Sequence, residues 1–264
     1  MGFWEALLLG IVQGLTEFLP VSSSGHLALF TKILGADRLP EENLLFTILV
    51  HAATALATLI VFRKDIAAII SGVFQKDDTQ ARHFVGKIVV SMLPAVVVGL
   101  FFEEEITALF GSNVALVGAM LCLTGLLLFF TDRATEKQHA ITYKIALIIG
   151  LAQAVAILPG ISRSGATIAT ALLIGAARPE AARFSFLMVI PLILGSMTKT
   201  LLDNGTAVFT SVDALPMAVG FVAALVSGVL ACTWMIALVK RSKLIYFAVY
   251  CAVVGSIALV VSWS

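Results

Sequence analysis

The sequence is poor in charged residues: Asp, Glu, Lys and Arg make up 12% of its 264 residues, whereas 60% are hydrophobic. The charged fraction is lower, and the hydrophobic fraction higher, than is usual in soluble domains. The formal net charge is only +1, and no run of Lys and Arg forms the basic surface that a nucleic acid requires. The composition therefore indicates an integral membrane protein with no nucleic-acid partner.

Cysteine is also scarce. Cys122, Cys232 and Cys251 lie in apolar segments, so we expect small core residues and no disulfide framework. The amino terminus lacks the basic leader and small-residue cleavage site of a removable signal peptide. We therefore expect its first apolar segment to be retained.

Segment length separates the apolar stretches that can cross a bilayer from those that cannot. A helix needs about 20 residues to cross a hydrocarbon core about 30 Å thick. Six segments meet this requirement: Asn43–Phe62, Phe84–Phe102, Val114–Phe130, Ala181–Leu202, Leu215–Val239 and Leu244–Val261. We predict that these six segments are full crossings.

Two other apolar stretches are interrupted by Pro, Gly and Ser. In the first, Phe3–Leu19 is followed by a break at Pro20–Ser24 and by the short piece Gly25–Gly35. A helix of ten residues rises only about 15 Å, half of the required distance. The second stretch repeats this arrangement: Tyr143–Leu158, the break Pro159–Ser164, and Gly165–Gly175. We predict two re-entrant hairpins whose tips reach the middle of the membrane. Two full crossings joined by an external loop are the alternative.

The two interrupted stretches belong to an internal repeat. A shift of 140 positions without a gap brings these residues onto identical ones: Ala6, Leu7, Gly10, Gln13, Ser22, Ser24, Gly25, Gly35, Ala36, Arg38 and Phe46. We therefore expect a single membrane domain, residues 1–264, with repeat one at residues 1–131 and repeat two at residues 141–264. In membrane proteins with such repeats, the working site commonly lies where the interrupted helices meet.

The distribution of basic residues predicts the topology, because cytoplasmic loops collect Lys and Arg. If each repeat is a re-entrant hairpin plus three crossings, one face receives thirteen basic residues: Arg63, Lys64, Lys76, Arg82, Lys87, Arg133, Lys137, Lys144, Arg178, Arg183, Lys240, Arg241 and Lys243. The other face receives three, Lys32, Arg38 and Lys199, and Arg163 lies at a hairpin tip. Three crossings is an odd number, so the second repeat must be inverted. The predicted fold is an all-α membrane protein of about ten helices with two inverted-topology repeats.

The hairpin tips are suited to binding an anion. Each break delivers the N-terminus of a short helix, near Gly25 and near Gly165, where free N–H groups and the helix dipole favour negative charge. Arg163 adds a planar fork that matches two phosphate oxygens. An arginine at membrane depth is costly, which favours a functional role over a purely structural pairing with Glu17. A phosphate fits this set better than a metal or a sugar.

Acid and base groups accompany the first break. Glu17 follows Gln13 by four residues, so both project from one face of a helix, and His26 begins the next helix. Glu17 could deprotonate a hydroxyl or water, or hold a divalent cation that bridges phosphate oxygens. His26 could protonate a leaving phosphate or act as a nucleophile. His51 lies alone in an apolar crossing and is interpreted as a buried, hydrogen-bonded side chain more readily than as a participant.

At these residues the sequence resembles the BacA/UppP family, the undecaprenyl pyrophosphate phosphatases of bacterial membranes. The resemblance spans the whole chain and depends on two signatures, Gln13 to Glu17 with Ser22 to His26, and Pro159 to Thr167. It implies removal of the terminal phosphate from the C55 isoprenoid pyrophosphate with the help of a divalent cation, Mg or Ca. This reaction regenerates the lipid carrier for peptidoglycan, and bacitracin resistance is associated with the family.

The resemblance also implies roles for individual residues. By matching positions, the catalytic and phosphate-binding residues are Glu17, Ser23, His26, Ser162, Arg163 and Thr167. Together with the reading of the two breaks, this predicts a catalytic set of Glu17, Ser23, His26 and Arg163, with Glu17 as the metal ligand. The predicted substrate-binding set is Gln13, Ser22, Ser24, Gly25, Gly160, Ser162, Ser164 and Thr167. Many family members carry Glu where this chain has Gln13. A neutral amide cannot act as a base and is a weaker metal ligand, which brings any two-carboxylate mechanism into question here.

Several alternatives remain open at this point. The nucleophile is Ser23, His26 or water, and the oligomeric state includes a possible homodimer. Inverted repeats with broken helices also occur in transporters, so a transporter or flippase for a phosphorylated lipid or an ion is the second hypothesis. The combination of Glu17, Ser23, His26 and Arg163 favours hydrolysis, because binding alone does not need it. We expect a multi-pass protein of the bacterial inner (plasma) membrane, surrounded by membrane lipid, with its active site facing the periplasm.

Overall fold

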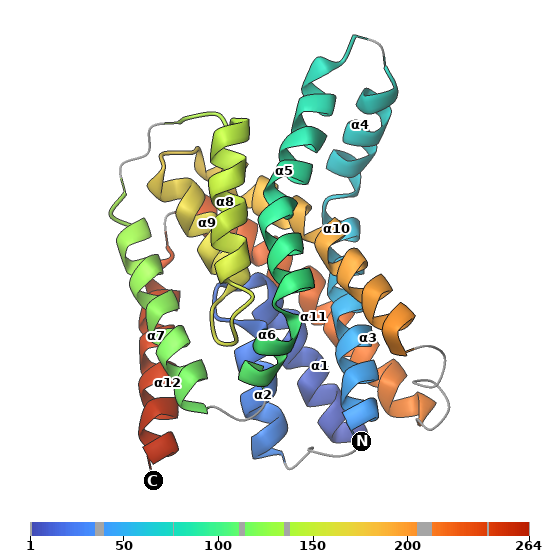
Figure 1. Cartoon of the computed structure of the whole chain (residues 1–264), viewed down its shortest axis with the longest axis vertical. Helices are drawn as coiled ribbons and strands as arrows, with labels where there is room; N and C mark the ends of the chain where they lie inside the picture. The colour runs from blue at the N-terminus through green and yellow to red at the C-terminus, as the bar shows by residue number, and fades with distance from the viewer. Residues whose placement is uncertain are drawn as a thin grey trace.

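The computed structural model describes residues 2–34, 40–75, 77–110, 114–134, 138–204, 213–241 and 243–263. Within these ranges the chain is all-helical and contains no named β-strand (Figure 1). The helices are α1 (Phe3–Phe18), α2 (Ser23–Ile33), α3 (Pro40–Val61), α4 (Arg63–Phe74), α5 (Thr79–Phe101), α6 (Glu103–Phe110), α7 (Val114–Thr131), α8 (Tyr143–Val155), α9 (Arg163–Leu173), α10 (Arg178–Asn204), α11 (Ala214–Lys240) and α12 (Ile245–Trp263). Gly35, Ala36 and Arg38 of the repeat, and Lys76 and Lys137 of the topology prediction, lie outside the described residues.

Six of these helices, α3, α5, α7, α10, α11 and α12, are long and apolar enough to cross a membrane. They coincide with the six segments predicted from the sequence, which confirms that part of the prediction. Many large apolar side chains on them face outward, among them Leu230, Val253 and Val260 at 66%, 52% and 69% exposure. Exposed apolar side chains of this kind are favourable in contact with lipid and unfavourable in contact with water. The chain is therefore a multi-pass membrane protein.

The described chain contains twelve helices, so the expectation of about ten was wrong by two. The additional helices are α4 and α6. Helix α4 follows α3 directly and begins with Arg63, Lys64 and Asp65, so its charge hid it from a search for apolar crossings. Helix α6 has only eight residues, and it begins with the acidic run at Glu103. Acidic residues are favourable at a helix N-terminus because they complement the helix dipole.

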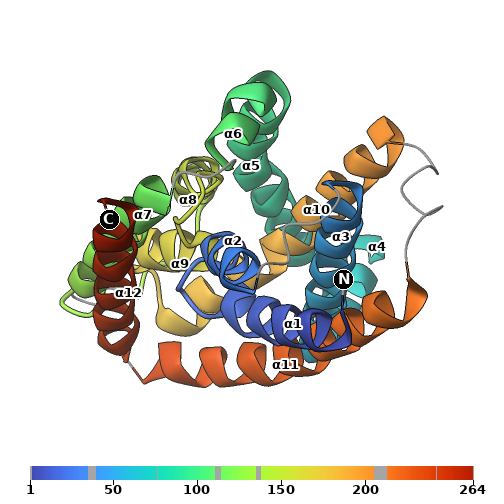
Figure 2. The same ribbon diagram turned by 90° about the horizontal axis from the view of Figure 1, so that it is seen from below.

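Close helix packing depends on small residues, as is usual where lipid supplies no hydrophobic drive between helices. A Cβ added at Gly10 of α1 would lie 2.4 Å from the carbonyl oxygen of Gly220 in α11. At the matching position of the repeat, a Cβ on Gly150 of α8 would lie 2.3 Å from the carbonyl oxygen of Ser91 in α5. The two hairpins therefore dock on α11 and α5 through equivalent glycines. Figure 2 shows α1 lying along α11.

Each interrupted stretch forms a pair of helices joined by an irregular break, and their re-entrant path in a membrane stays a prediction. Helix α1 ends at Phe18 and α2 begins at Ser23, whereas α8 ends at Val155 and α9 begins at Arg163. Helices α2 and α9 have 11 residues each, a rise of about 16 Å. Both begin two residues earlier than expected, so Ser23 and Arg163 belong to the first turns of these helices. In Figure 1 the α1–α2 pair occupies the lower half of the molecule and the α8–α9 pair the upper half.

The two breaks meet inside the molecule. The Ser164 hydroxyl donates a hydrogen bond to the carbonyl oxygen of Leu19 over 3.3 Å. A Cβ added at Gly25 would lie 3.3 Å from the Cα of Gly160, and one added at Gly165 would lie 3.2 Å from the Cβ of Pro20. Glycine at these positions allows the two breaks to approach each other closely.

Candidate active site

The turns that start α2 and α9 share the same capping hydrogen bond. The Ser22 Oγ accepts a hydrogen bond from the Gly25 N–H over 3.3 Å, and the Ser162 Oγ accepts one from the Gly165 N–H over 3.0 Å. Ser22 and Ser162 are equivalent in the repeat and act as side-chain caps of the helix N-termini. Their hydroxyls therefore shape the turns, and direct substrate binding by Ser22 and Ser162 stays a prediction.

Glu17 lies at the centre of a buried polar cluster. Its Oε1 pairs with Nη2 of Arg163, and its Oε2 accepts hydrogen bonds from the Ser23 Oγ at 2.7 Å and the Gln13 Nε2 at 3.0 Å. The structure thus joins residues of both hairpins, 146 positions apart in the sequence, through one charge-assisted contact. The pairing of Arg163 with Glu17 does occur, but Arg163 remains one-fifth exposed and reaches the adjoining cavity.

That cavity has a volume of about 400 Å³, and we call it the hairpin cavity. The polar side chains that line it come from the two hairpins and from α3 and α10: Glu17, Ser23, Ser24, Gln153, Arg163, Thr47, His51, Ser196 and Thr200. Its walls come largely from apolar side chains of α3, α5, α10 and the second break: Leu44, Ile48, Ala95, Ala156, Ile157, Ile161, Val189, Leu192, Ile193 and Met197. A cavity lined by an arginine and by many apolar side chains suits an amphiphilic ligand with an anionic head.

His26 lies outside the hairpin cavity. Its Nδ1–H donates to the carbonyl oxygen of Ser22 over 2.9 Å, and its Nε2 lies 2.8 Å from the hydroxyl of Tyr250 in α12. The two rings are stacked with centroids 5.6 Å apart, and His26 is only 2% exposed. The described arrangement therefore gives both ring nitrogens a protein partner and places neither at the cavity.

Gly160, Ser164 and Thr167 of the predicted substrate set do not line the hairpin cavity. The Thr167 hydroxyl is 2.6 Å from that of Ser185 in α10. Gly160 has φ of +94°, a conformation natural only for glycine, and a Cβ there would lie 2.6 Å from the carbonyl oxygen of Val117. In this arrangement Gly160, Ser164 and Thr167 hold the break in place, and phosphate binding by them stays a prediction.

Gln153 and His51 line the cavity and were not among the predicted site residues. Gln153 is the repeat counterpart of Gln13, and this identity could have indicated it. Its side chain is buried, and neither of its amide atoms has a hydrogen-bond partner in the described structure. His51 of α3 also lines the cavity, although its position alone in an apolar segment favoured a structural interpretation. No local signal in the sequence shows toward which neighbour His51 is turned.

The side chains available as ligands limit how this protein could bind a metal ion. No group of three or more His, Cys, Asp or Glu side chains gathers anywhere in the described ranges. Glu17 is therefore a single carboxylate, but Oε1 of neighbouring Gln13 is buried without a hydrogen-bond partner in the described structure. Mg²⁺ commonly binds one or two carboxylates together with substrate phosphates. The residues fit a cation that is shared with a phosphate ligand.

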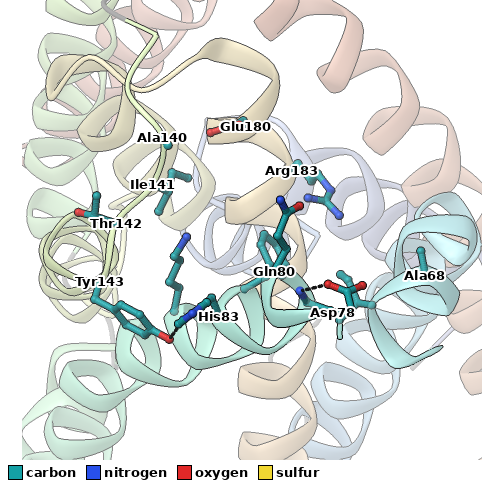
Figure 3. Close-up of a pocket in the computed structure, with 14 residues that line it drawn as sticks. Ala68, Asp78, Gln80, His83, Ala140, Ile141, Thr142, Tyr143, Glu180 and Arg183 are labelled. Carbon is teal, nitrogen blue, oxygen red and sulfur yellow. Dashed lines mark hydrogen bonds between the residues drawn. The ribbon is translucent and has the colours of Figure 1, made fainter. Parts of the chain in front are cut away.

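A second, larger cavity of about 770 Å³ lies between the α4–α5 pair and the starts of α8 and α10 (Figure 3). The polar side chains around this cavity stabilise the fold through contacts within the protein. His83 Nδ1 lies 3.0 Å from the Tyr143 hydroxyl, and Asp78 caps α5 by accepting from the Ala81 N–H. Arg183 pairs with Asp65 at 2.6 Å. Figure 3 shows the His83–Tyr143 and Asp78 bonds, and the cavity lacks the serine and arginine of the hairpin tips.

Fold and site together define a multi-pass α-helical membrane protein with a Glu–Arg–Ser cluster in the lining of a cavity. The family model described as "Bacitracin resistance protein BacA" matches residues 6–257, and the chain belongs to this family. Curated relatives named undecaprenyl-diphosphatase are similar along their whole length. The protein of Christiangramia forsetii is 54% identical over 100% of both chains, and that of Bacteroides fragilis strain YCH46 is 52% identical over 99% of both. The relative from Methanococcus vannielii is 42% identical over 94% of this chain and 95% of its own.

Proposed function

We propose that this protein hydrolyses undecaprenyl diphosphate to undecaprenyl phosphate and inorganic phosphate, and so recycles the lipid carrier of peptidoglycan synthesis. The similarity to relatives named undecaprenyl-diphosphatase supports the substrate. The observation that carries the proposal is the contact of Glu17 with both Arg163 and Ser23, three residues that line the hairpin cavity. A binding protein would need the arginine but not a carboxylate that accepts a proton from a hydroxyl.

Each side chain of the site has a separate role in the proposed reaction. Arg163 and the start of α9 bind the diphosphate, since a guanidinium fork pairs with two phosphate oxygens. Glu17 accepts the proton of the attacking oxygen, which belongs to Ser23 or to a water in the same position. The apolar walls take the first part of the isoprenoid tail. All of these groups come from one chain, so the proposed site does not need a homodimer to be complete.

A divalent cation is part of this proposal. Glu17 and the carbonyl oxygen of the Gln13 side chain would hold it together with phosphate oxygens. When bound, the cation would neutralise negative charge on the transferred phosphate. Gln13 supplies a neutral ligand here, so the binding should be weaker than with a second carboxylate.

We also propose the inverted topology, with the first hairpin entering from the periplasmic side of a plasma membrane and the second from the cytoplasm. Three contacts at one end of the molecule support it. Arg183 at the start of α10 pairs with Asp65 just beyond α3, Asp132 just beyond α7 accepts from the Ile245 N–H of α12, and His139 bonds to Gly175. Helices α3 and α7 thus end where their repeat counterparts α10 and α12 begin. This is the relation expected of inverted copies.

Cysteine labelling tests this topology. Cysteines introduced at Glu104 and Asp203 should react with a membrane-impermeant reagent added to intact cells, whereas one at Lys240 should not. The three native cysteines lie within apolar helices, so the unsubstituted protein is the background control. Reaction of all three introduced cysteines from outside would contradict the inverted arrangement.

The activity itself is tested by phosphate release from undecaprenyl diphosphate with purified protein in detergent. We expect one phosphate per substrate molecule, and a chelator of divalent cations should abolish most of the release. Added Mg²⁺ or Ca²⁺ should restore it. Protein that binds the lipid or moves it between leaflets without releasing phosphate would favour the transporter hypothesis instead.

A further inference from the structure

One buried polar side chain of the hairpin cavity has no role in the reaction proposed above. Gln153, in the last turn of α8, lines the cavity and is only 1% exposed. Neither its Nε2 nor its Oε1 has a hydrogen-bond partner within the described part of the chain. A buried amide without a partner is unfavourable and rare in native proteins, so we expect this side chain to serve a ligand.

The repeat explains why this amide is left without a partner. Gln13 and Gln153 occupy the same position in the two copies, 140 residues apart. In the first copy the Gln13 Nε2 donates to the carboxylate of Glu17, one helical turn later, over 3.0 Å. In the second copy the residue one turn later is Ile157, which also lines the cavity but has no polar side-chain atom. The two copies share the glutamine, and only the first copy contains its partner.

The packing of α8 on α5 supplies no substitute partner. Gly150 lets α8 approach α5 so closely that an added Cβ would lie 2.3 Å from the carbonyl oxygen of Ser91. Ala95, four residues after Ser91, and Gln153, three residues after Gly150, both line the cavity. Alanine has no polar side-chain atom, so the amide of Gln153 remains available at the cavity.

The chemistry of the proposed substrate identifies the group that this amide can bind. Undecaprenyl diphosphate is hydrocarbon apart from its diphosphate, so all of its hydrogen-bond acceptors belong to two phosphate groups. Glu17 contacts both Ser23 and Arg163, and these three residues are assigned to the terminal phosphate, where the reaction occurs. Gln153 is bonded to none of them, and Ile157, the next lining residue on its own helical face, is apolar. The phosphate that joins the terminal phosphate to the apolar tail is therefore the acceptor that suits Gln153.

We infer that Gln153 binds the phosphate that stays on the lipid, an assignment that rests on the proposed phosphatase function. Its Nε2–H groups donate to oxygens of this phosphate, which can only accept. The amide is neutral, so it orients the substrate without holding the anionic product as tightly as a second arginine would. Gln153 is thus a substrate-binding residue, and it takes no part in the transfer of protons.

The experiment measures kcat and KM for undecaprenyl diphosphate, and inhibition by each of the two products, in purified wild type and Gln153→Leu. KM should rise by about 10- to 100-fold, the effect of one lost hydrogen bond to a charged group, with kcat changed by less than about threefold. The loss falls on binding because the retained phosphate is already charged in the bound substrate. The inhibition constant of undecaprenyl phosphate should rise by a similar factor, whereas that of inorganic phosphate should not change. Gln80→Leu, at an exposed glutamine of the second cavity, is the control and should behave as wild type.

The melting temperature separates a binding role from a structural one. Without ligand, Gln153→Leu should melt at or above the wild-type temperature, because the substitution removes no hydrogen bond within the described structure. A lower melting temperature together with an unchanged KM would assign Gln153 to the fold and overturn the inference. If Gln153→Leu does not fold, Gln153→Met, which is unbranched and of similar length, takes its place under the same criteria.

The outcomes are separable from those of the proposed function. If wild type releases no phosphate, the proposed function fails, whereas binding of undecaprenyl phosphate to wild type and Gln153→Leu still tests the contact. If wild type is active and Gln153→Leu keeps both KM and the undecaprenyl phosphate inhibition constant within about twofold, the assignment of Gln153 is wrong. Equal weakening of inhibition by inorganic phosphate would place Gln153 at the terminal phosphate and would also overturn the inference.

Discussion

Glu17→Gln is expected to lower phosphate release by about 10⁴-fold, the upper range for loss of a general base. The amide can still accept from Ser23 and Gln13, so the shape of the cluster is retained. It can neither take a proton from the attacking oxygen nor neutralise Arg163, whose partner in the structure is the Glu17 carboxylate. The effect should therefore fall mainly on kcat.

The measurement is kcat for phosphate release by protein shown to be monodisperse, with its melting temperature recorded. The matched control is Glu105→Gln, which removes an exposed carboxylate of α6 and should leave kcat unchanged. A Glu17→Gln protein that folds and keeps one-tenth or more of the wild-type kcat would show that another group is the base. Gln13 cannot be that group, because its amide does not titrate.

Arg163→Lys is expected to lower kcat/KM by about 10³-fold, comparable with the loss of a donor that stabilises developing negative charge. Lysine keeps the positive charge and can still pair with Glu17, so the fold should persist. It loses the planar fork that binds a carboxylate on one side and phosphate oxygens on the other. Charge alone is therefore not expected to support turnover.

Arg183→Lys is the matched control for this variant. Arg183 also forms an ion pair, with Asp65, but it lies at the second cavity and should tolerate the change. Activity of Arg163→Lys within threefold of wild type would remove Arg163 from phosphate binding. Its contact with Glu17 would then have the structural role that the sequence left open.

The fold was largely predictable because the bilayer imposes a length on each crossing. The six crossings were identified from runs of apolar residues of about 20, and the structure agrees to within a few residues at most ends. The α4 and α6 helices were missed because they are short and carry charge at their starts. Whether an amphipathic segment of this kind is helical depends on its neighbour, and α4 is helical while packed on α5.

The candidate site was predictable only in part. Gln13 and Glu17 could be placed together because residues four apart share one face of a helix. Arg163 was assigned to the same site because the repeat places both breaks in corresponding positions. Gln153 was missed although the same repeat matches it to Gln13. Tyr250 lies 224 positions from His26, and no pattern of local spacing could connect them.

The sequence by itself determined the membrane class, the six crossings, the repeat, and the glutamate, serine and arginine of the polar cluster. These properties follow from composition, run length, spacing along single helices and the identities at a shift of 140 positions, and none of them requires knowledge of how the helices pack. Only the tertiary structure decided which histidine faces the cavity. His26 begins α2 next to Gly25, yet its ring is stacked on that of Tyr250 in α12, whereas His51 of α3 lines the hairpin cavity. The direction of a side chain relative to other helices depends on how those helices pack, and the packing joins residues far apart in the chain.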